Sequence, residues 1–209
     1  FVFDVKGSSG FPAAHVLNRA IGLMNSNLMI VFMKILNPTA TFQVGDMSRV
    51  PFVSPKVRGG EVDANVNDLI TIGKNDWNSY ETSWDFTTLP LLQSEYSQST
   101  LEASYHSLRT HWREMALKMQ RLEEENNRIF IDAYGLQDEL TPEVPLEEIT
   151  LTCNPHYRYG GDKSEEELET LLLADTMREL VSYAVGCMFG RYSLDKPGLI
   201  LANQGDTLA

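Results

Sequence analysis

The side chains best suited to metal binding or nucleophilic catalysis are few in this 209-residue chain, which has four histidines and two cysteines. Cys153 and His156 have the local spacing of half a zinc site, but Cys187 stands alone. His106 and His111 are five residues apart on an expected helix and have no further ligand near them in the sequence. No histidine has a companion motif that would activate a serine or cysteine. The sequence therefore predicts no catalytic residue and no metal site.

A glycine-rich turn near the N-terminus is the better candidate for binding, and its chemistry suits phosphate. Backbone N–H groups and hydroxyls in such a turn can donate to phosphate oxygens, and Lys6 adds a positive charge. The stretch at 4–11 also resembles a glycine-rich S-adenosylmethionine loop, but two expected helices follow it instead of the strand that would supply an acidic residue for the ribose. The expected DNA-binding residues are Lys6, Ser8, Ser9, Arg19, Arg49 and Lys56.

The stretch Asn154-Pro155-His156-Tyr157 resembles the Asn-Pro-Pro-Tyr loop of amino-group DNA methyltransferases. In that loop the asparagine binds the target amine and the aromatic ring stacks on the flipped base. The preceding stretch at 148–152 is strand-like, as such a site requires. His156, however, replaces the second proline, whose fixed φ angle shapes the loop. We interpret the stretch as a structural segment.

The elements expected to position these residues are a small block of strands and helices, followed by a region of helices alone. The first block is expected to contain strands at 1–5, 39–44 and 50–53 and helices at 12–24 and 27–36. Gly59-Gly60 marks a boundary, after which the pattern is helical. The predicted fold class is therefore α+β and mostly helical, with a small α/β block before a helical region. The expected divisions are 1–58, 59–140 and 141–209.

The most regular pattern alternates spacings of four and three residues over more than four heptads. It predicts one helix of about 35 residues at about 98–133, with Asn126 as the one polar residue of the seam. An exposed half of this seam would be a partner surface. A capping box, Ser164 with Glu167, predicts the start of another helix at about 165–189. The seam consists of Leu101, Tyr105, Leu108, Trp112, Met115, Met119, Leu122, Asn126, Ile129 and Ala133.

Charge is distributed unevenly along the chain. The net charge of −12 argues against a nucleic-acid-binding protein when the chain is taken as a whole. Residues 1–60, however, contain six basic and two acidic residues, a net charge of +4, which leaves −16 for the remainder. This asymmetry favours a segment that faces a polyanion beside an acidic scaffold.

The composition excludes several other classes of protein. Hydrophobic residues make up 43% and charged residues 22%, which is typical of a globular protein rather than a disordered one. No apolar run reaches the roughly 20 residues of a membrane span, so no membrane association is expected. Two cysteines without a visible signal peptide predict a cytoplasmic location. Phe1 in place of an initiating Met predicts a piece of a longer protein whose end is also truncated.

Several long stretches carry a family resemblance. The segment LNPTATFQVGD at 36–46, with FVFDVKGSSGFP at 1–12 and GLMNSNL at 22–28, resembles the end of the target recognition domain of large single-chain adenine methyltransferases. Further matching stretches run to the other end of the chain. They are NDWNSYETSWDF at 75–86, NRIFIDAYGLQDELTPEV at 127–144 and SYAVGCMFGRYSLD at 182–195. Together they resemble the BREX phage-defence adenine-specific DNA methyltransferases of the PglX type and, more loosely, single-chain type II restriction–modification enzymes.

This resemblance implies a parent enzyme that transfers a methyl group from S-adenosylmethionine to an adenine in double-stranded DNA. The chain would be a C-terminal fragment with the end of the recognition domain at 1–58, inactive alone, without a cofactor and without a catalytic residue. Its partners would be DNA, the missing methyltransferase domain of the same polypeptide and other BREX proteins.

Two other hypotheses remain open from the sequence. The acidic helical region could be a protein-interaction module that never touches DNA. The stretches at 7–11 and 154–157 could instead make the chain a compact, free-standing methyltransferase, which would bind S-adenosylmethionine.

Overall fold

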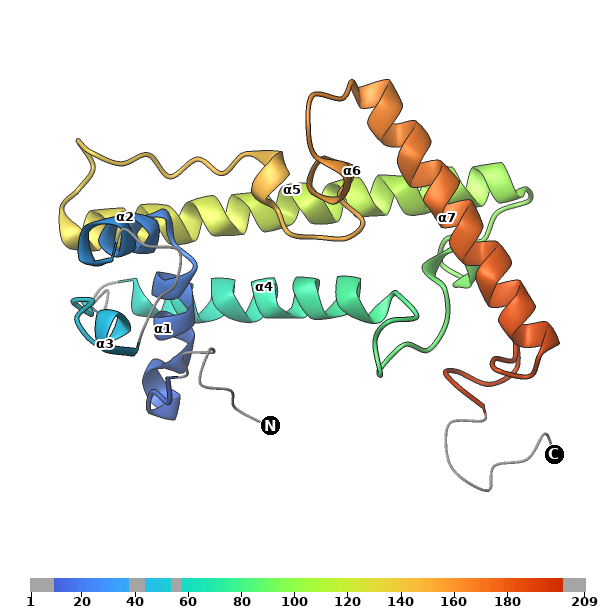
Figure 1. Ribbon diagram of the computed structural model, residues 1–209, viewed down its shortest axis with the longest axis horizontal. Coiled ribbons are helices and arrows are strands. Elements are labelled where there is room, and N and C mark those ends of the chain that lie inside the picture. Colours follow the sequence, from blue (N-terminus) through green and yellow to red (C-terminus); the bar gives the residue numbers. More distant parts are fainter. Residues whose placement is uncertain (1–9, 38–43, 54–57, 201–209) are drawn as a thin grey trace. The chain divides into compact units, whose positions relative to one another are not determined.

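The computed structural model describes residues 10–37, 44–53 and 58–200, and these residues fold into helices (Figure 1). In the described ranges, the 3₁₀ turns η1 (Ala14–Val16), η2 (Pro90–Leu92) and η3 (Leu146–Glu148) occur between or before the α-helices. Within this part of the chain the extended structure is limited to an isolated bridge between Ser193 and Lys196. The α-helices are α1 (Leu17–Met24), α2 (Asn27–Leu36), α3 (Val44–Met47), α4 (Gly59–Asn78), α5 (Leu101–Tyr134), α6 (Pro155–Tyr159) and α7 (Glu165–Met188).

The predicted α+β fold with a mixed α/β block is wrong, because the described part of that block consists of helices and irregular segments and contains no strand. Val44, expected to end a strand, begins α3 instead. The expected strand at 50–53 is irregular, and the N–H of Val53 donates to the hydroxyl of Tyr134 at 2.9 Å rather than to a neighbouring strand. Four apolar residues are too few to distinguish a strand from an irregular segment, and Pro51 removes a backbone donor. The expected strands at 1–5 and 39–43 lie outside the described residues.

Two compact units make up the chain. Unit 1 comprises Phe1–Ile70 and Gln120–Val144, and unit 2 comprises Thr71–Met119 and Pro145–Ala209. Helices α4 and α5 each supply residues to both units. The three-part division at 58 and 140, inferred from glycine and proline positions and the helical pattern, stays a prediction.

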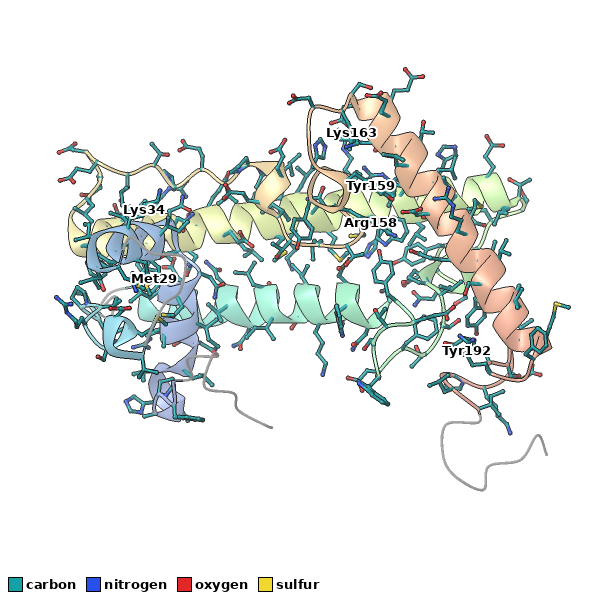
Figure 2. The ribbon with its side chains drawn as sticks, viewed as in Figure 1. Met29, Lys34, Arg158, Tyr159, Lys163 and Tyr192 are labelled. Atoms are coloured by element: carbon teal, nitrogen blue, oxygen red, sulfur yellow. The ribbon has the colours of Figure 1, made fainter. Side chains whose placement is uncertain are left out.

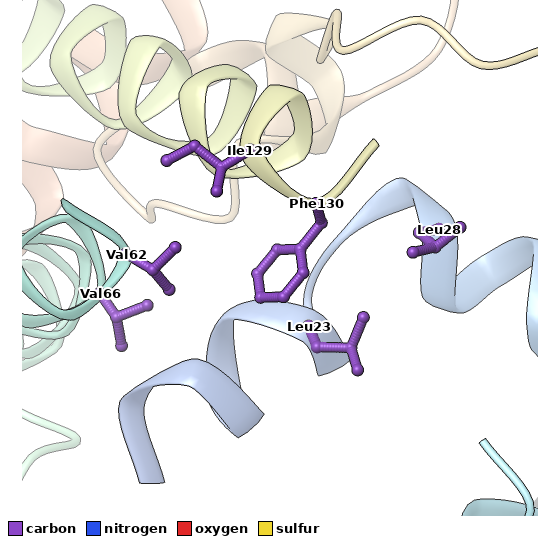
Figure 3. Close-up of a cluster of buried hydrophobic side chains, with 6 residues drawn as sticks. All are labelled: Leu23, Leu28, Val62, Val66, Ile129 and Phe130. Atoms are coloured by element: carbon purple, nitrogen blue, oxygen red, sulfur yellow. The ribbon is translucent and has the colours of Figure 1, made fainter. Parts of the chain in front are cut away.

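The core of unit 1 brings together side chains from α1, α2, α4 and α5. Figure 3 shows Phe130 projecting from α5 between Val62 and Val66 of α4 and Leu23 of α1. Phe130 and Val62 are completely buried. The helices can approach closely here because Gly22 has no side chain: a Cβ at this position would lie 3.1 Å from Val62 and 3.2 Å from Phe130.

The heptad pattern correctly predicted a single long helix, since α5 contains 34 residues. The chain itself covers most of the seam, and six of its ten positions are buried. Asn126, the expected polar position, is 3% exposed and donates to the Gly22 carbonyl at 2.8 Å. The expected partner surface on this seam is therefore replaced by packing within the chain. The six buried positions are Tyr105, Leu108, Trp112, Met119, Asn126 and Ile129.

Unit 2 has a core of aromatic residues at the end of α7. Phe86 packs edge-on against Tyr183 and Tyr192, whose rings stack with centroids 4.8 Å apart. Helix α7 begins with the capping box that the sequence predicted: the Ser164 hydroxyl accepts from the Glu167 N–H at 3.2 Å, and the Glu167 carboxylate accepts from the Ser164 N–H at 2.8 Å. These two bonds satisfy donors at the helix start.

Among the described helices, none is by itself long and apolar enough to cross a membrane, and the stretches Ala14–Met24 and Asn27–Leu36 reach that length only as a pair bent by 79°.

Candidate functional site

The structure describes two of the six predicted DNA-binding residues, Arg19 and Arg49, and their surroundings differ. Lys6, Ser8, Ser9 and Lys56 lie outside the described residues. Arg19, on α1, directs its guanidinium to Asp63 of α4, with 3.0 Å between Nη2 and Oδ2. Arg49 follows α3 in an exposed turn. The structure therefore brings Arg19 to a carboxylate and leaves Arg49 at the solvent-facing surface.

Carboxylates from outside residues 1–60 offset the positive charge of that segment. Arg58 pairs with Glu61 at 2.6 Å and with Glu125 of α5, which also pairs with Arg128. The hydrogen bond from Arg58 lowers the pKa of Glu61. Unit 1 as a whole has eight basic and twelve acidic residues, a net charge of −4. The positive segment of the sequence is thus part of an acidic unit.

In a methyltransferase-like loop, the side-chain amide of Asn154 would have to be available to bind the target amine. In the structure this amide is hydrogen-bonded within the chain through both its oxygen and its nitrogen. Its Oδ1 accepts from the His156 N–H at 3.2 Å and caps α6. Its Nδ2 donates to the carbonyls of Leu146 and Ile149 at 2.8 and 2.9 Å. The side chain is buried, with 2% of the residue exposed. The expected strand before this loop is absent from the described structure, and the stretch contains η3 and irregular backbone.

Asp76, which the sequence did not indicate, fixes the backbone directly before Asn154 by accepting two hydrogen bonds. It lies near the end of α4, is 5% exposed, and accepts the N–H groups of Thr152 and Cys153 at 2.7 and 3.0 Å. Burial, with a further contribution from the Asp76 charge, raises the pKa of the Cys153 thiol. This cysteine therefore stays protonated, which suits a core residue better than a nucleophile or a metal ligand. No local spacing signals a contact between residues 76 positions apart.

Arg158 and Tyr159 connect α6 to α7 through a network of charges (Figure 2). The guanidinium donates to Glu179 at 3.0 Å, lies 3.3 Å from Asp175 and covers the Tyr80 ring at 5.7 Å from its centroid. The Tyr159 hydroxyl donates to Asp175 at 2.9 Å. Burial raises the pKa of Glu179, and Arg158 opposes that shift. These charged and polar groups are paired with one another inside the chain, which indicates a structural role.

A small pocket lies between α5, α6 and the start of α7. Its volume is about 80 Å³, well below the roughly 300 Å³ of a typical ligand site. Most of the ionisable side chains in its wall already have a partner: Arg109 donates to Glu169 at 2.8 Å through Nε, and His156 Nε2 lies 2.9 Å from a Glu165 carboxylate oxygen. Arg113 of the wall is exposed. Within the described residues, no group of three or more histidines, cysteines or carboxylates could hold a metal ion.

The pocket and side-chain contacts described above do not identify a class of protein, whereas comparison with known proteins does. No family model matches the sequence. Two curated relatives are adenine-specific methyltransferases, and their similarity runs from end to end of the chain.

The particular relatives are PglX and BrxX. The chain is 37% identical over 206 residues, 97% of its length, to the adenine-specific methyltransferase PglX of Lacticaseibacillus casei (strain Zhang). It is 31% identical over 209 residues, 99% of its length, to the adenine-specific methyltransferase BrxX of Escherichia coli O9:H4 (strain HS). The resemblance to the PglX type is thus confirmed. The chain spans only 16% and 17% of these relatives, about one sixth of their length.

Proposed function

We propose that this chain is a part of an S-adenosylmethionine-dependent, adenine-specific DNA methyltransferase of a phage-defence or restriction–modification system, and that it lies outside the catalytic domain. The observation that carries this proposal is the end-to-end similarity to one sixth of two adenine-specific methyltransferases. The occupied amide of Asn154 supports a non-catalytic role for the loop that most resembles a catalytic one. The proposed partners are double-stranded DNA, the rest of the methyltransferase and other proteins of the same defence system.

Within that enzyme we propose a role in DNA recognition and as a scaffold. Arg49 is the candidate among the described residues whose exposure suits a phosphate contact. Lys6, Ser8, Ser9 and Lys56 are proposed as further contacts on the basis of the sequence alone. Arg19 contributes less, because Asp63 already neutralises its charge. Phosphate contacts of this kind fix the protein on the duplex without reading its sequence.

The proposal is tested by titrating the purified chain with duplex DNA at low and moderate salt. We expect weak binding that Arg49→Ala reduces roughly fivefold, the equivalent of about 1 kcal/mol for one exposed ionic contact. Arg113→Ala, at an exposed arginine of α5, is the matched control and should leave the affinity unchanged. Calorimetry with S-adenosylmethionine should show no binding. Cofactor binding would favour a free-standing methyltransferase, and equal effects of the two substitutions would indicate a non-specific charge effect.

A second candidate is a protein-interaction module that makes no direct contact with DNA. The observation that favours it is the acidic charge of both units, −4 for unit 1 and −8 for unit 2. If DNA affinity is unchanged when Lys6, Arg19 and Arg49 are all replaced by alanine, this second function is the better description.

A further inference from the structure

Helix α7 carries apolar residues on two opposite faces. One face is buried in unit 2 through Leu168, Leu172, Thr176, Tyr183 and Gly186. The opposite face has apolar residues at alternating spacings of three and four, which we name the α7 seam. The α7 seam consists of Ala174, Met177, Val181, Ala184 and Met188.

The α7 seam becomes steadily more exposed toward the end of the helix. Val181 is 62% exposed and Met188 is 83% exposed, while Ala174 and Met177 are half-buried. Val185 beside the seam is 44% exposed, and Phe189 directly after the helix is 82% exposed. A surface helix normally presents polar residues to water, so a continuous apolar stripe of this kind indicates an interaction surface.

The absence of cations and the helical spacing of the α7 seam indicate what kind of partner it binds. A nucleic acid or an anionic lipid surface would need cations, yet the seam itself carries none, and the neighbouring Arg178 pairs with Asp175 at 2.5 Å. Alternating spacings of three and four are those by which one helix packs along another. The partner that fits is therefore an apolar helix face.

The length of the relatives points to the polypeptide from which that helix comes. The whole of this chain, α7 included, aligns with one sixth of each methyltransferase, so five sixths of each relative consist of other sequence. We propose that the α7 seam is the docking site for a helix from the part of the methyltransferase polypeptide that lies outside this chain. The inference rests on the proposed function, because it takes the chain to be part of such an enzyme.

Photo-crosslinking in the full-length methyltransferase that contains this chain tests the proposal. A photoreactive phenylalanine analogue is introduced as Val181→p-benzoylphenylalanine and, in a second protein, as Met188→p-benzoylphenylalanine. The matched control is the same replacement at Ser182, which is exposed on α7 but lies off the seam. After irradiation, the crosslinked peptides are identified by mass spectrometry.

We expect both seam positions to crosslink to one helical segment of the same polypeptide outside this chain, and Ser182 to give at most a tenth of that product. Crosslinks to a second copy, to another protein or to residues of this chain, or no crosslinks at all, would overturn the proposal. The same enzyme without a photoreactive residue is assayed in parallel for adenine methylation of duplex DNA. Methylation without the expected crosslinks refutes the docking site alone, whereas an enzyme that methylates no adenine refutes the proposed function.

Discussion

Asp76 shows how one buried side chain can hold a loop that has little regular structure. Its carboxylate accepts two backbone N–H groups, from Thr152 and Cys153, and the residue is 5% exposed. Asp76→Ala leaves the buried N–H of Cys153 and the partly buried N–H of Thr152 without this acceptor, so we expect the free energy of unfolding to fall by about 3 kcal/mol. Denaturant titration followed by circular dichroism measures this loss.

Two further variants show whether the hydrogen bonds cause that loss. Asp76→Asn keeps one acceptor oxygen but turns its NH2 group, a donor, toward the other backbone N–H, so its loss should approach that of Asp76→Ala although the shape is kept. Asp85→Ala changes an exposed carboxylate nearby in the sequence and should stay within about 0.5 kcal/mol of the unmodified protein. If Asp76→Ala and Asp85→Ala behave alike, the contacts of Asp76 contribute little to stability.

Gly22 and Gly73 both lie inside helices, and the structure predicts opposite effects of alanine. Helix propensity alone favours alanine by about 1 kcal/mol at either position. At Gly22 a Cβ would meet Asn126 Oδ1 at 2.8 Å, and overpacking of about 1–3 kcal/mol outweighs the propensity. At Gly73 nothing lies within 4 Å, so the gain should be realised. Thermal unfolding of Gly22→Ala and Gly73→Ala should shift the melting temperature down and up respectively, and an increase in both would contradict the close packing of α1.

At the level of elements, Arg158 joins α6 to α7, and its contribution depends on pH. Burial raises the pKa of Glu179, so the folded state keeps a proton that the unfolded state has lost, and stability falls as the pH rises through that range. Arg158 opposes this shift, so Arg158→Met raises the pKa of Glu179 further. We expect a loss of about 2 kcal/mol near pH 7 that shrinks toward pH 4, measured by unfolding at both pH values.

A double variant separates the charge from the packing of Arg158. Glu179→Gln in the Arg158→Met protein removes the buried, unpaired charge and should restore most of the stability at pH 7. Arg178→Met is the control, since that side chain is 75% exposed and its ion pair is a surface one. A loss for Arg158→Met that is equal at both pH values would show that packing, not charge, is responsible.

At the scale of the whole molecule, an acidic chain with a few exposed cations should bind DNA weakly and with a shallow salt dependence. The net charge is −12, and four of the proposed DNA-binding residues are basic. At about −0.9 per phosphate contact, the slope of log affinity against log salt should be no steeper than about −3.6. Fluorescence anisotropy over a salt series measures the slope, and Arg49→Ala should make it shallower by about 0.9. A slope near zero would exclude phosphate contacts.

How far the sequence was informative differs between elements. The spacing of the seam predicted α5, and the pair Ser164 and Glu167 predicted the start of α7, because each signal lies within a single helix. The prediction of a strand at 50–53 was wrong because a four-residue apolar run is too short to show a period. The acceptor of the Val53 N–H, the hydroxyl of Tyr134, is also distant in the sequence.

The sequence by itself determined α5, α7 and the family resemblance, since these depend on residues near one another along the chain or on their order. Only the tertiary structure decided that Arg19 meets Asp63, that Asp76 holds the loop at 152–153 and that the chain covers the seam of α5. Each of these contacts joins residues tens of positions apart. Their proximity is set by how helices pack, which no local spacing specifies.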